Sequence, residues 1–235
     1  FGYSATEDGQ ILKGVDFAAK TGKLTALIGT NGAGKSTLLK TIMGILKGKG
    51  EISVNGKPVS QYSTKDFSST VSYLSQDNDC KVNLSVFEVV MLGRMGSMSF
   101  RVSDEDIAAT QEVLERLNLQ RFASRSIMEL SGGQRQLVFM AQALVKEPKI
   151  LILDEPTSAL DLHKQFDLLT LLKNLTQEND FTTLVTLHHL DLAAMFADEI
   201  IVLKEGRVYA QGAPKDIFTE AMMEDVYRVK TKIYM

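Results

Sequence analysis

Short apolar runs alternate with longer amphipathic stretches along most of this 235-residue chain. A run of four to eight apolar residues predicts a buried strand, whereas apolar residues that recur every three or four positions predict a helix. The apolar runs predict strands at 23–28, near 51–54, and at 71–74, 150–153, 182–187 and 200–203. The amphipathic stretches predict helices from 35 to about 46, from 134 to 145, from about 163 to 175, and from 188 to about 197. A short amphipathic segment follows a proline at 217–227.

The order of these elements predicts an α/β fold. Strands and helices alternate from residue 134 to residue 203, and alternating elements of this length form a parallel sheet covered by helices. The stretch from about 84 to 117 differs, because it has helical periodicity and is rich in Met and acidic residues. We therefore expect one α/β unit with an inserted helical region, since no internal repeat or low-complexity linker divides the chain.

Composition narrows the class of protein. The net charge is −3, and 44% of residues are hydrophobic and 23% charged, which is typical of a globular chain. Lys and Arg do not cluster, so nucleic acid is not an expected partner. Cys80 is the only cysteine, which excludes an internal disulfide and favours a role in packing.

Neither a membrane span nor a signal peptide is expected. The apolar runs fall short of the roughly 18 residues that a spanning helix needs. The first residues, Phe1-Gly2-Tyr3, contain no initiator Met, basic segment or apolar segment. They are typical of a chain that starts inside a domain, and a first strand is expected to be missing.

A phosphate-binding loop follows the first predicted strand. Residues 29–36 read GTNGAGKS, which fits the P-loop pattern GxxxxGK[ST], between a strand and a helix as that loop requires. Glycines let the backbone amides point at phosphate oxygens, and the helix adds its positive end. A glycine-rich turn with an exposed lysine is the alternative. The predicted nucleotide-binding residues are Gly29, Thr30, Asn31, Gly32, Ala33, Gly34, Lys35, Ser36 and Thr37, with the Lys35 charge on the phosphates and the Ser36 hydroxyl on Mg²⁺.

Two acidic residues directly follow the apolar run at 150–153. Asp154 is placed at a strand end, where its oxygens suit Mg²⁺, a cation that prefers oxygen ligands. Helix capping is the alternative role for Asp154. Glu155 follows, and a turn at the strand end can aim its carboxylate at the γ-phosphate to polarise water. We predict that Glu155 is the general base, the alternative being a solvated surface glutamate.

A second anion-binding element precedes the helix predicted at 134. Residues 130–134 read LSGGQ, and two glycines with a serine at a helix start present amides and a hydroxyl. One nucleotide held by the P-loop cannot easily use both elements of one chain. The economical arrangement is a symmetric pair in which each chain closes over the other's nucleotide. The residues predicted to act in this way are Ser131, Gly132, Gly133 and Gln134.

Together these motifs resemble the ABC ATPase family over essentially the whole chain. The motifs, in the family's order and spacing, are GTNGAGKS, Gln76, LSGGQ, LILDEP, SALD and a late histidine. The resemblance implies ATP and Mg²⁺ as cofactors and a P-loop NTPase core. That core is a parallel sheet flanked by helices, with an antiparallel β region near the N-terminus and an inserted helical subdomain. The resemblance also implies a single domain, 1–235. Its catalytic core would comprise 1–76 and about 135–235, and its helical signature subdomain about 77–134.

The resemblance also implies roles for single residues. Tyr3 would stack on adenine, unless it is an edge-strand tyrosine. Gln76 would touch Mg²⁺ or the attacking water and link the nucleotide to the helical subdomain, the alternative being a polar loop residue. Asp161, in the SALD loop at 158–161, would cross a dimer interface to the partner's P-loop and could also cap the following helix. The catalytic set is therefore Glu155, His188, Gln76 and Lys35, and the metal set is Ser36, Gln76 and Asp154.

The late histidine requires a choice between His188 and His189. The pattern H-D-L-x-x-A, counted back from Ala193, places His188 at the γ-phosphate. The family usually carries an acid at the next position, where this chain has His189. A core or surface histidine is the alternative for each, and it is the favoured role for His189.

Several segments are similar to importers of the iron–siderophore, haem and cobalamin type. These segments are 86–94, 104–106, 130–136 and 165–169, and Leu137 stands where those relatives usually have Arg. The resemblance implies an ATPase subunit that energises such an importer at the cytoplasmic face of the inner membrane. Its implied partners are a second copy in a head-to-tail dimer, a transmembrane permease at about Asp77 to Arg94, and indirectly a solute-binding protein.

The main alternative function is a soluble ABC ATPase of iron–sulfur cluster assembly. A DNA-repair ATPase would need a long coiled-coil insertion, and none fits between Gln76 and Leu130. A translation factor would need two such domains, for which 235 residues are too few. A nucleotide-binding scaffold without catalysis is disfavoured, because both Glu155 and His188 are present.

Overall fold

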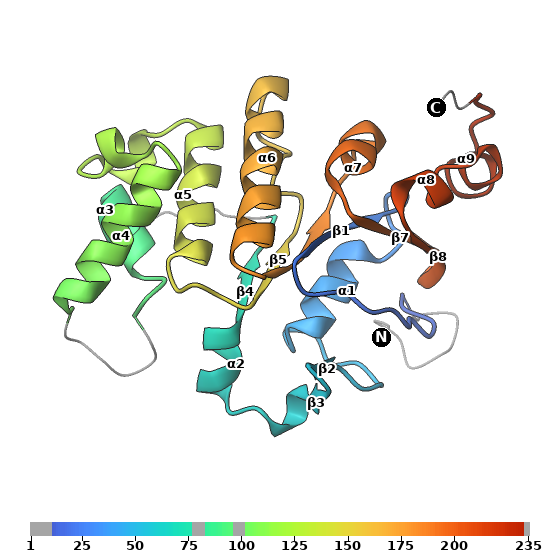
Figure 1. The fold of residues 1–235 in the computed structure, drawn as a ribbon, viewed down its shortest axis with the longest axis horizontal. Helices are drawn as coiled ribbons and strands as arrows, with labels where there is room; N and C mark the ends of the chain where they lie inside the picture. The colour runs from blue at the N-terminus through green and yellow to red at the C-terminus, as the bar shows by residue number, and fades with distance from the viewer. Residues whose placement is uncertain (1–10, 77–82, 96–101, 233–235) are drawn as a thin grey trace.

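The fold is built around a six-stranded sheet. The computed structural model in Figure 1 describes residues 11–76, 83–95 and 102–232. The strands are β1 (Lys23–Ile28), β2 (Ser53–Val54), β3 (Lys57–Pro58), β4 (Val71–Leu74), β5 (Ile150–Leu153), β6 (Thr182–Thr186), β7 (Glu199–Lys204) and β8 (Arg207–Gly212). The sheet order is β4-β5-β6-β1-β7-β8, in which all neighbours are parallel except β7 and β8. This arrangement confirms the predicted α/β class, and β2 pairs with β3 in a separate antiparallel hairpin.

Helices cover both faces of the sheet. They are α1 (Lys35–Ile42), α2 (Thr64–Thr70), α3 (Val86–Met91), α4 (Asp104–Arg116), α5 (Gly132–Leu144), α6 (Leu162–Glu178), α7 (Leu190–Phe196), α8 (Pro214–Ile217) and α9 (Glu220–Tyr227). In β7, Ile200 and Val202 join one buried cluster with α5, α6 and α7, whereas Ile201 and Leu203 join another with α1. Strands buried on both sides explain why the sequence shows continuous apolar runs.

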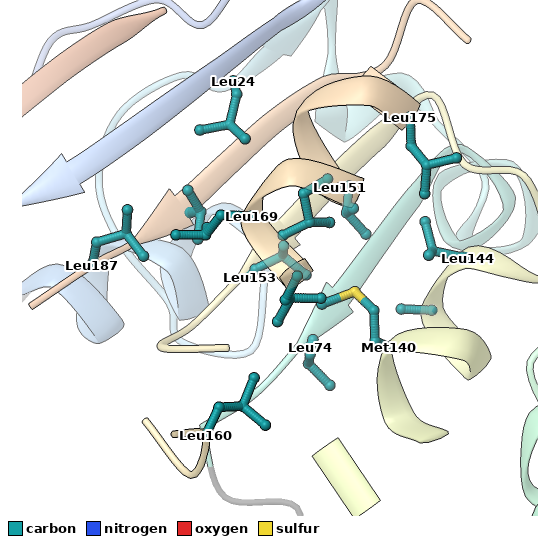
Figure 2. Close-up of a cluster of buried hydrophobic side chains, with 14 of the residues drawn as sticks. Leu24, Leu74, Met140, Leu144, Leu151, Leu153, Leu160, Leu169, Leu175 and Leu187 are labelled. Carbon is teal, nitrogen blue, oxygen red and sulfur yellow. The ribbon is translucent and has the colours of Figure 1, made fainter. Parts of the chain in front are cut away.

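The larger cluster joins α5 and α6 to the sheet. Figure 2 shows leucines of β5 and α6 facing Met140 and Leu144 of α5, with Leu74 of β4 beside them. Leu151, Leu153 and Leu169 are at most 1% exposed. Helix α6, which follows Asp161, is therefore packed against strand β5, which ends just before Asp154.

A group of helices lies at one end of the sheet, where α3, α4 and α5 gather beyond β4 (Figure 1). A Cβ at Gly93 would lie 2.3 Å from the Gln142 carbonyl oxygen, so only glycine fits between α3 and α5. Arg94 pairs with Asp106 of α4 at 2.7 Å and donates to the Val145 carbonyl at 3.2 Å. The Arg94 guanidinium holds the pKa of Asp106 at about 2.

Some elements differ from the sequence prediction. The helix predicted from 35 to about 46 ends at Ile42, because Gly44 takes a φ of 68°. Helix α2 was not predicted, since its Thr- and Ser-rich sequence has no apolar period; the Ser63 side chain starts it by accepting from the Asp66 amide at 3.0 Å. Strands β3 and β8 were also missed. β8 is an edge strand of alternating exposed and half-buried residues, so it has no apolar run.

No helix in the described ranges is long and apolar enough to span a bilayer.

Two leucines of α6, one buried and one exposed, allow a matched test of the core. We expect Leu169→Ala to lower the free energy of unfolding by about 2–5 kcal/mol, because it opens a cavity in a fully buried cluster. Leu162→Ala on the same helix removes a side chain that is 63% exposed and should change stability little. Urea unfolding followed by circular dichroism measures both, and equal effects would contradict this account of the core.

Candidate functional site

The predicted site residues gather at one edge of the sheet. Strand β1 leads into the P-loop, β4 is followed by Gln76, β5 by Asp154 and Glu155, and β6 by His188. These four strands are parallel neighbours, so their carboxyl ends meet at the same edge. Residues that are more than a hundred positions apart in the sequence therefore share one site.

The P-loop depends on glycine at its two ends. Gly29 has a φ of 150°, and a Cβ there would lie 2.2 Å from the Leu203 carbonyl oxygen of β7. Gly34 has a φ of 104° and precedes α1 without a side-chain cap. Helix α1 therefore begins with unshielded backbone amides, as binding of a phosphate requires.

Lys35 is buried beside both carboxylates. Its Nζ donates to the carbonyl oxygens of Gly29 at 2.8 Å and Thr30 at 3.2 Å. Burial lowers the pKa of the Lys35 ammonium, and the charges of Glu155 and Asp154 oppose this shift. The cation therefore lies across its own loop, with two carboxylates near enough to stabilise its charge.

Asp154 has one oxygen in hydrogen bonds and one without them. Its Oδ1 accepts from the Ser36 hydroxyl at 3.1 Å and from the Thr186 hydroxyl at 2.9 Å. Its Oδ2 is buried and has no hydrogen-bond partner within the described ranges. A carboxylate that contacts a serine hydroxyl and keeps one buried oxygen free fits the oxygen ligands that Mg²⁺ requires.

Glu155 lies in a turn that redirects its side chain. The residue has a φ of 52°, a left-handed conformation that is uncommon outside glycine. Its amide donates to the Thr186 hydroxyl at 2.7 Å. Its carboxylate accepts from Gln76 Nε2 at 2.6 Å on one oxygen and contacts His188 Nε2 with the other. Three predicted catalytic residues from three loops thus meet at one carboxylate.

The structure distinguishes the two adjacent histidines. His188 contacts Glu155 with its imidazole, whereas His189 precedes α7 and makes no side-chain cap there. The choice of His188 from the sequence pattern therefore has geometric support.

Thr186 is a site residue that the sequence analysis missed. It is the last residue of β6, is 0% exposed, and bonds both to Asp154 and to the amide of Glu155. A polar residue at the end of a strand was the available signal, but β6 reads TTLVT and holds two further threonines. It was not informative alone, because buried threonines often bond only to their own backbone.

The LSGGQ residues start α5 on the other face of the sheet from α1. Ser131 and Gln134 form a capping box, in which the Gln134 amide donates to the Ser131 hydroxyl at 3.3 Å and Gln134 Oε1 accepts from the Ser131 amide at 3.0 Å. Gly132 is exposed and nothing lies within 4 Å of its Cβ position. The start of α5 is thus open to a ligand, away from the P-loop helix.

Two further predicted residues have different outcomes. Asp161 is exposed and caps α6, where its carboxylate accepts from the Lys164 amide at 3.0 Å and pairs with the Lys164 ammonium at 2.6 Å. These bonds to Lys164 lower the pKa of Asp161. The capping role left open by the sequence is therefore present. Tyr3 lies outside the described residues.

The sequence pattern of the ABC transporter family matches residues 12–158. The chain belongs to the ABC transporter family. This ABC cassette is 38% identical over 229 residues to the iron(3+)-hydroxamate import ATP-binding protein FhuC of Bacillus subtilis, covering 96% of this chain and 85% of that protein. It is 36% identical over 225 residues to the hemin import ATP-binding protein HmuV of Streptomyces coelicolor, covering 95% and 80%.

A solved structure agrees with these relatives. The ABC cassette is similar, with a TM-score of 0.77 and 30% identity, to the ATP-binding cassette MJ0796 in a dimeric post-hydrolysis state bound to ADP and phosphate. The match covers 87% of this chain and 90% of that chain. These comparisons confirm the predicted activity, that of an ATP-binding and ATP-hydrolysing subunit of an ABC importer.

The Thr186 hydroxyl provides a test of the site. We expect Thr186→Val in this ABC cassette to lower kcat for ATP about tenfold, because it leaves the Glu155 amide without its buried acceptor. Thr186→Ser should restore most of the rate. Thr183→Val, in the same strand, removes another buried hydroxyl whose partner is Thr176, and should leave kcat near normal. Equal rates for the two valine variants in a steady-state ATPase assay would contradict this role.

Proposed function

We propose that two copies of this chain form a head-to-tail dimer that holds two ATP molecules and drives uptake of an iron–siderophore, haem or cobalamin-type solute. Each nucleotide would be bound by the P-loop of one copy and by Ser131 to Gln134 of the other. Support comes from the two phosphate-binding elements, whose helices lie on opposite faces of the sheet. The dimeric state of MJ0796 provides a precedent.

The observation that carries the catalytic proposal is the meeting of Gln76 and His188 on the Glu155 carboxylate. Glu155 would accept the proton of the attacking water, with Gln76 and His188 orienting the water and the γ-phosphate. Lys35 would move from its loop carbonyls to the phosphates, where its positive charge offsets the charge that develops during hydrolysis. Tyr3 is proposed to stack on the adenine, and Asp161 to reach the partner's P-loop.

The residues fit a magnesium ion bound with ATP. Ser36 and Asp154 would hold it, with Gln76 as a further oxygen ligand, since the Ser36 hydroxyl already contacts Asp154 Oδ1 and the other carboxylate oxygen, Oδ2, is free. When bound, Mg²⁺ neutralises phosphate charge and orients the β- and γ-phosphates.

A permease would dock on the helical subdomain, which we assign to about 77–134 between core segments 1–76 and about 135–235. Exposed apolar side chains occur there on Leu92, Met95 and Met128, which are 42% to 50% exposed. Exposed apolar groups of this kind are typical of interfaces. The chain would then lie at the cytoplasmic face of the membrane, with a solute-binding protein on the far side. The part of the predicted groove at 77–82 lies outside the described residues.

Replacement of the general base separates binding from hydrolysis. We expect Glu155→Gln to bind ATP and to dimerise while its turnover falls by at least a hundredfold, because an amide cannot accept the proton of water. Size-exclusion chromatography with ATP and a phosphate-release assay measure the two properties. Near-normal hydrolysis by this variant would remove Glu155 as the base.

Co-purification tests the transport role. We expect the tagged chain, expressed in its native host and extracted in mild detergent, to co-purify with a multi-span membrane permease. Leu92→Asp with Met95→Asp should release that permease without changing the ATPase rate of the isolated chain, because both side chains are exposed and absent from the catalytic cluster. Recovery of soluble iron–sulfur scaffold proteins in place of a permease would favour the alternative function.

A further inference from the structure

A buried glutamine supports the loop that leaves the catalytic carboxylate. Gln165, in the first turn of α6, is 7% exposed. Its Nε2 donates to the carbonyl oxygens of Thr157 and Leu160, both at 3.1 Å. A side-chain amide has two N–H groups, so both are used on the loop that contains SALD.

Other hydrogen bonds shape this loop from within. The Ser158 hydroxyl donates to the Glu155 carbonyl at 3.0 Å, and the Leu160 amide donates to the Thr157 carbonyl at 3.1 Å. These bonds close short turns and do not attach the loop to the core. Gln165 does attach it, because α6 is packed on the sheet through Leu169 and its neighbours.

The same loop contacts the LSGGQ residues of its own chain. A Cβ added to Gly133 would lie 2.9 Å from Leu160 Cδ2 and 3.4 Å from the Ala159 carbonyl oxygen. Leu160 is 7% exposed, and Figure 2 places it at the edge of the buried cluster. The SALD loop and the LSGGQ residues are therefore in van der Waals contact, and Gln165 anchors the loop through its two hydrogen bonds.

We propose that Gln165 is a positioning residue that holds the SALD loop and the LSGGQ residues as one unit, so that both meet the nucleotide bound by a second copy of the chain. The inference rests on the head-to-tail dimer proposed above. A buried amide joined to two carbonyls specifies one loop conformation more narrowly than an apolar side chain of the same size could. In the part of the chain that the structure describes, the side-chain hydrogen bonds of Gln165 go to the SALD loop and not to Glu155, so we expect its effect on the partner's site.

The test compares three substitutions on α6. Gln165→Met keeps the length of the side chain but removes both loop bonds. Thr176→Val removes a different buried group, whose hydroxyl bonds to the Leu172 carbonyl and to Thr183 at the far end of the helix. Gln177→Leu changes an exposed glutamine. Each is made with Glu155→Gln to measure ATP-dependent dimerisation by analytical ultracentrifugation, and without it to measure kcat and KM for ATP.

We expect Gln165→Met to raise the Kd of the ATP-dependent dimer about tenfold and to lower kcat by a similar factor, since loss of two buried hydrogen bonds is sufficient for such a change. ATP affinity of the monomer, measured with a fluorescent analogue at dilute protein, should change less than twofold. Thr176→Val should lower Tm without weakening the dimer, and Gln177→Leu should change neither.

Two results would overturn the inference while leaving the proposed dimer intact. One is a dimer that Gln165→Met does not weaken. The other is a loss that Thr176→Val reproduces at equal loss of Tm, since that would make Gln165 merely structural. If Gln165→Met does not fold, Leu160→Ala removes the contact with Gly133 and must weaken the dimer in the same way. Failure of Glu155→Gln alone to dimerise with ATP would instead refute the proposed dimer, and the inference with it.

Discussion

The turn between Asp154 and Glu155 depends on a single buried hydroxyl. Leu153 of β5 pairs with Val185 of β6, so the next residue of β6, Thr186, lies beside the point where β5 ends. There the hydroxyl accepts from the Glu155 amide and donates to the Asp154 carboxylate. Because the Glu155 backbone is left-handed, the two consecutive carboxylates diverge. In the proposed mechanism, Asp154 would face the metal ion and Glu155 the attacking water.

This divergence determines the charge distribution of the site. Lys35, Asp154 and Glu155 are each less than 9% exposed, and burial of an unpaired charge is costly. The ammonium lies near both carboxylates, which stabilise it against the burial that lowers its pKa. A bound triphosphate would bring negative charge into the same space. The Lys35 ammonium would balance part of that charge directly, and a magnesium ion held at the free oxygen of Asp154 would balance more of it.

Much of this arrangement could be predicted from the sequence, because a motif fixes residue types at short spacing and parallel strands bring their ends together. Strands 71–74 and 150–153 were predicted with their observed bounds, and Gln76, Glu155 and His188 do converge. Thr186 and Gln165 could not be predicted. Their roles depend on which backbone groups lie beside them after folding, and a buried polar side chain does not reveal its partner in the sequence. Strand β8 was missed for a similar reason, because edge strands lack a continuous apolar run.

The short stretch from Glu155 to Gln165 links the catalytic carboxylate to the LSGGQ residues of the same chain. Within these residues the chain leaves the Glu155 carboxylate, contacts Gly133 through Leu160, and enters α6, which packs on the sheet. The hydrogen bonds of Thr186 hold the start of this stretch, and those of Gln165 hold its end. A shift of Gly133 against Leu160 would therefore press on a residue whose own carbonyl is bonded to Gln165. Because both ends are fixed, the middle of the loop has little freedom to absorb that movement, and part of the displacement would reach the backbone at Glu155.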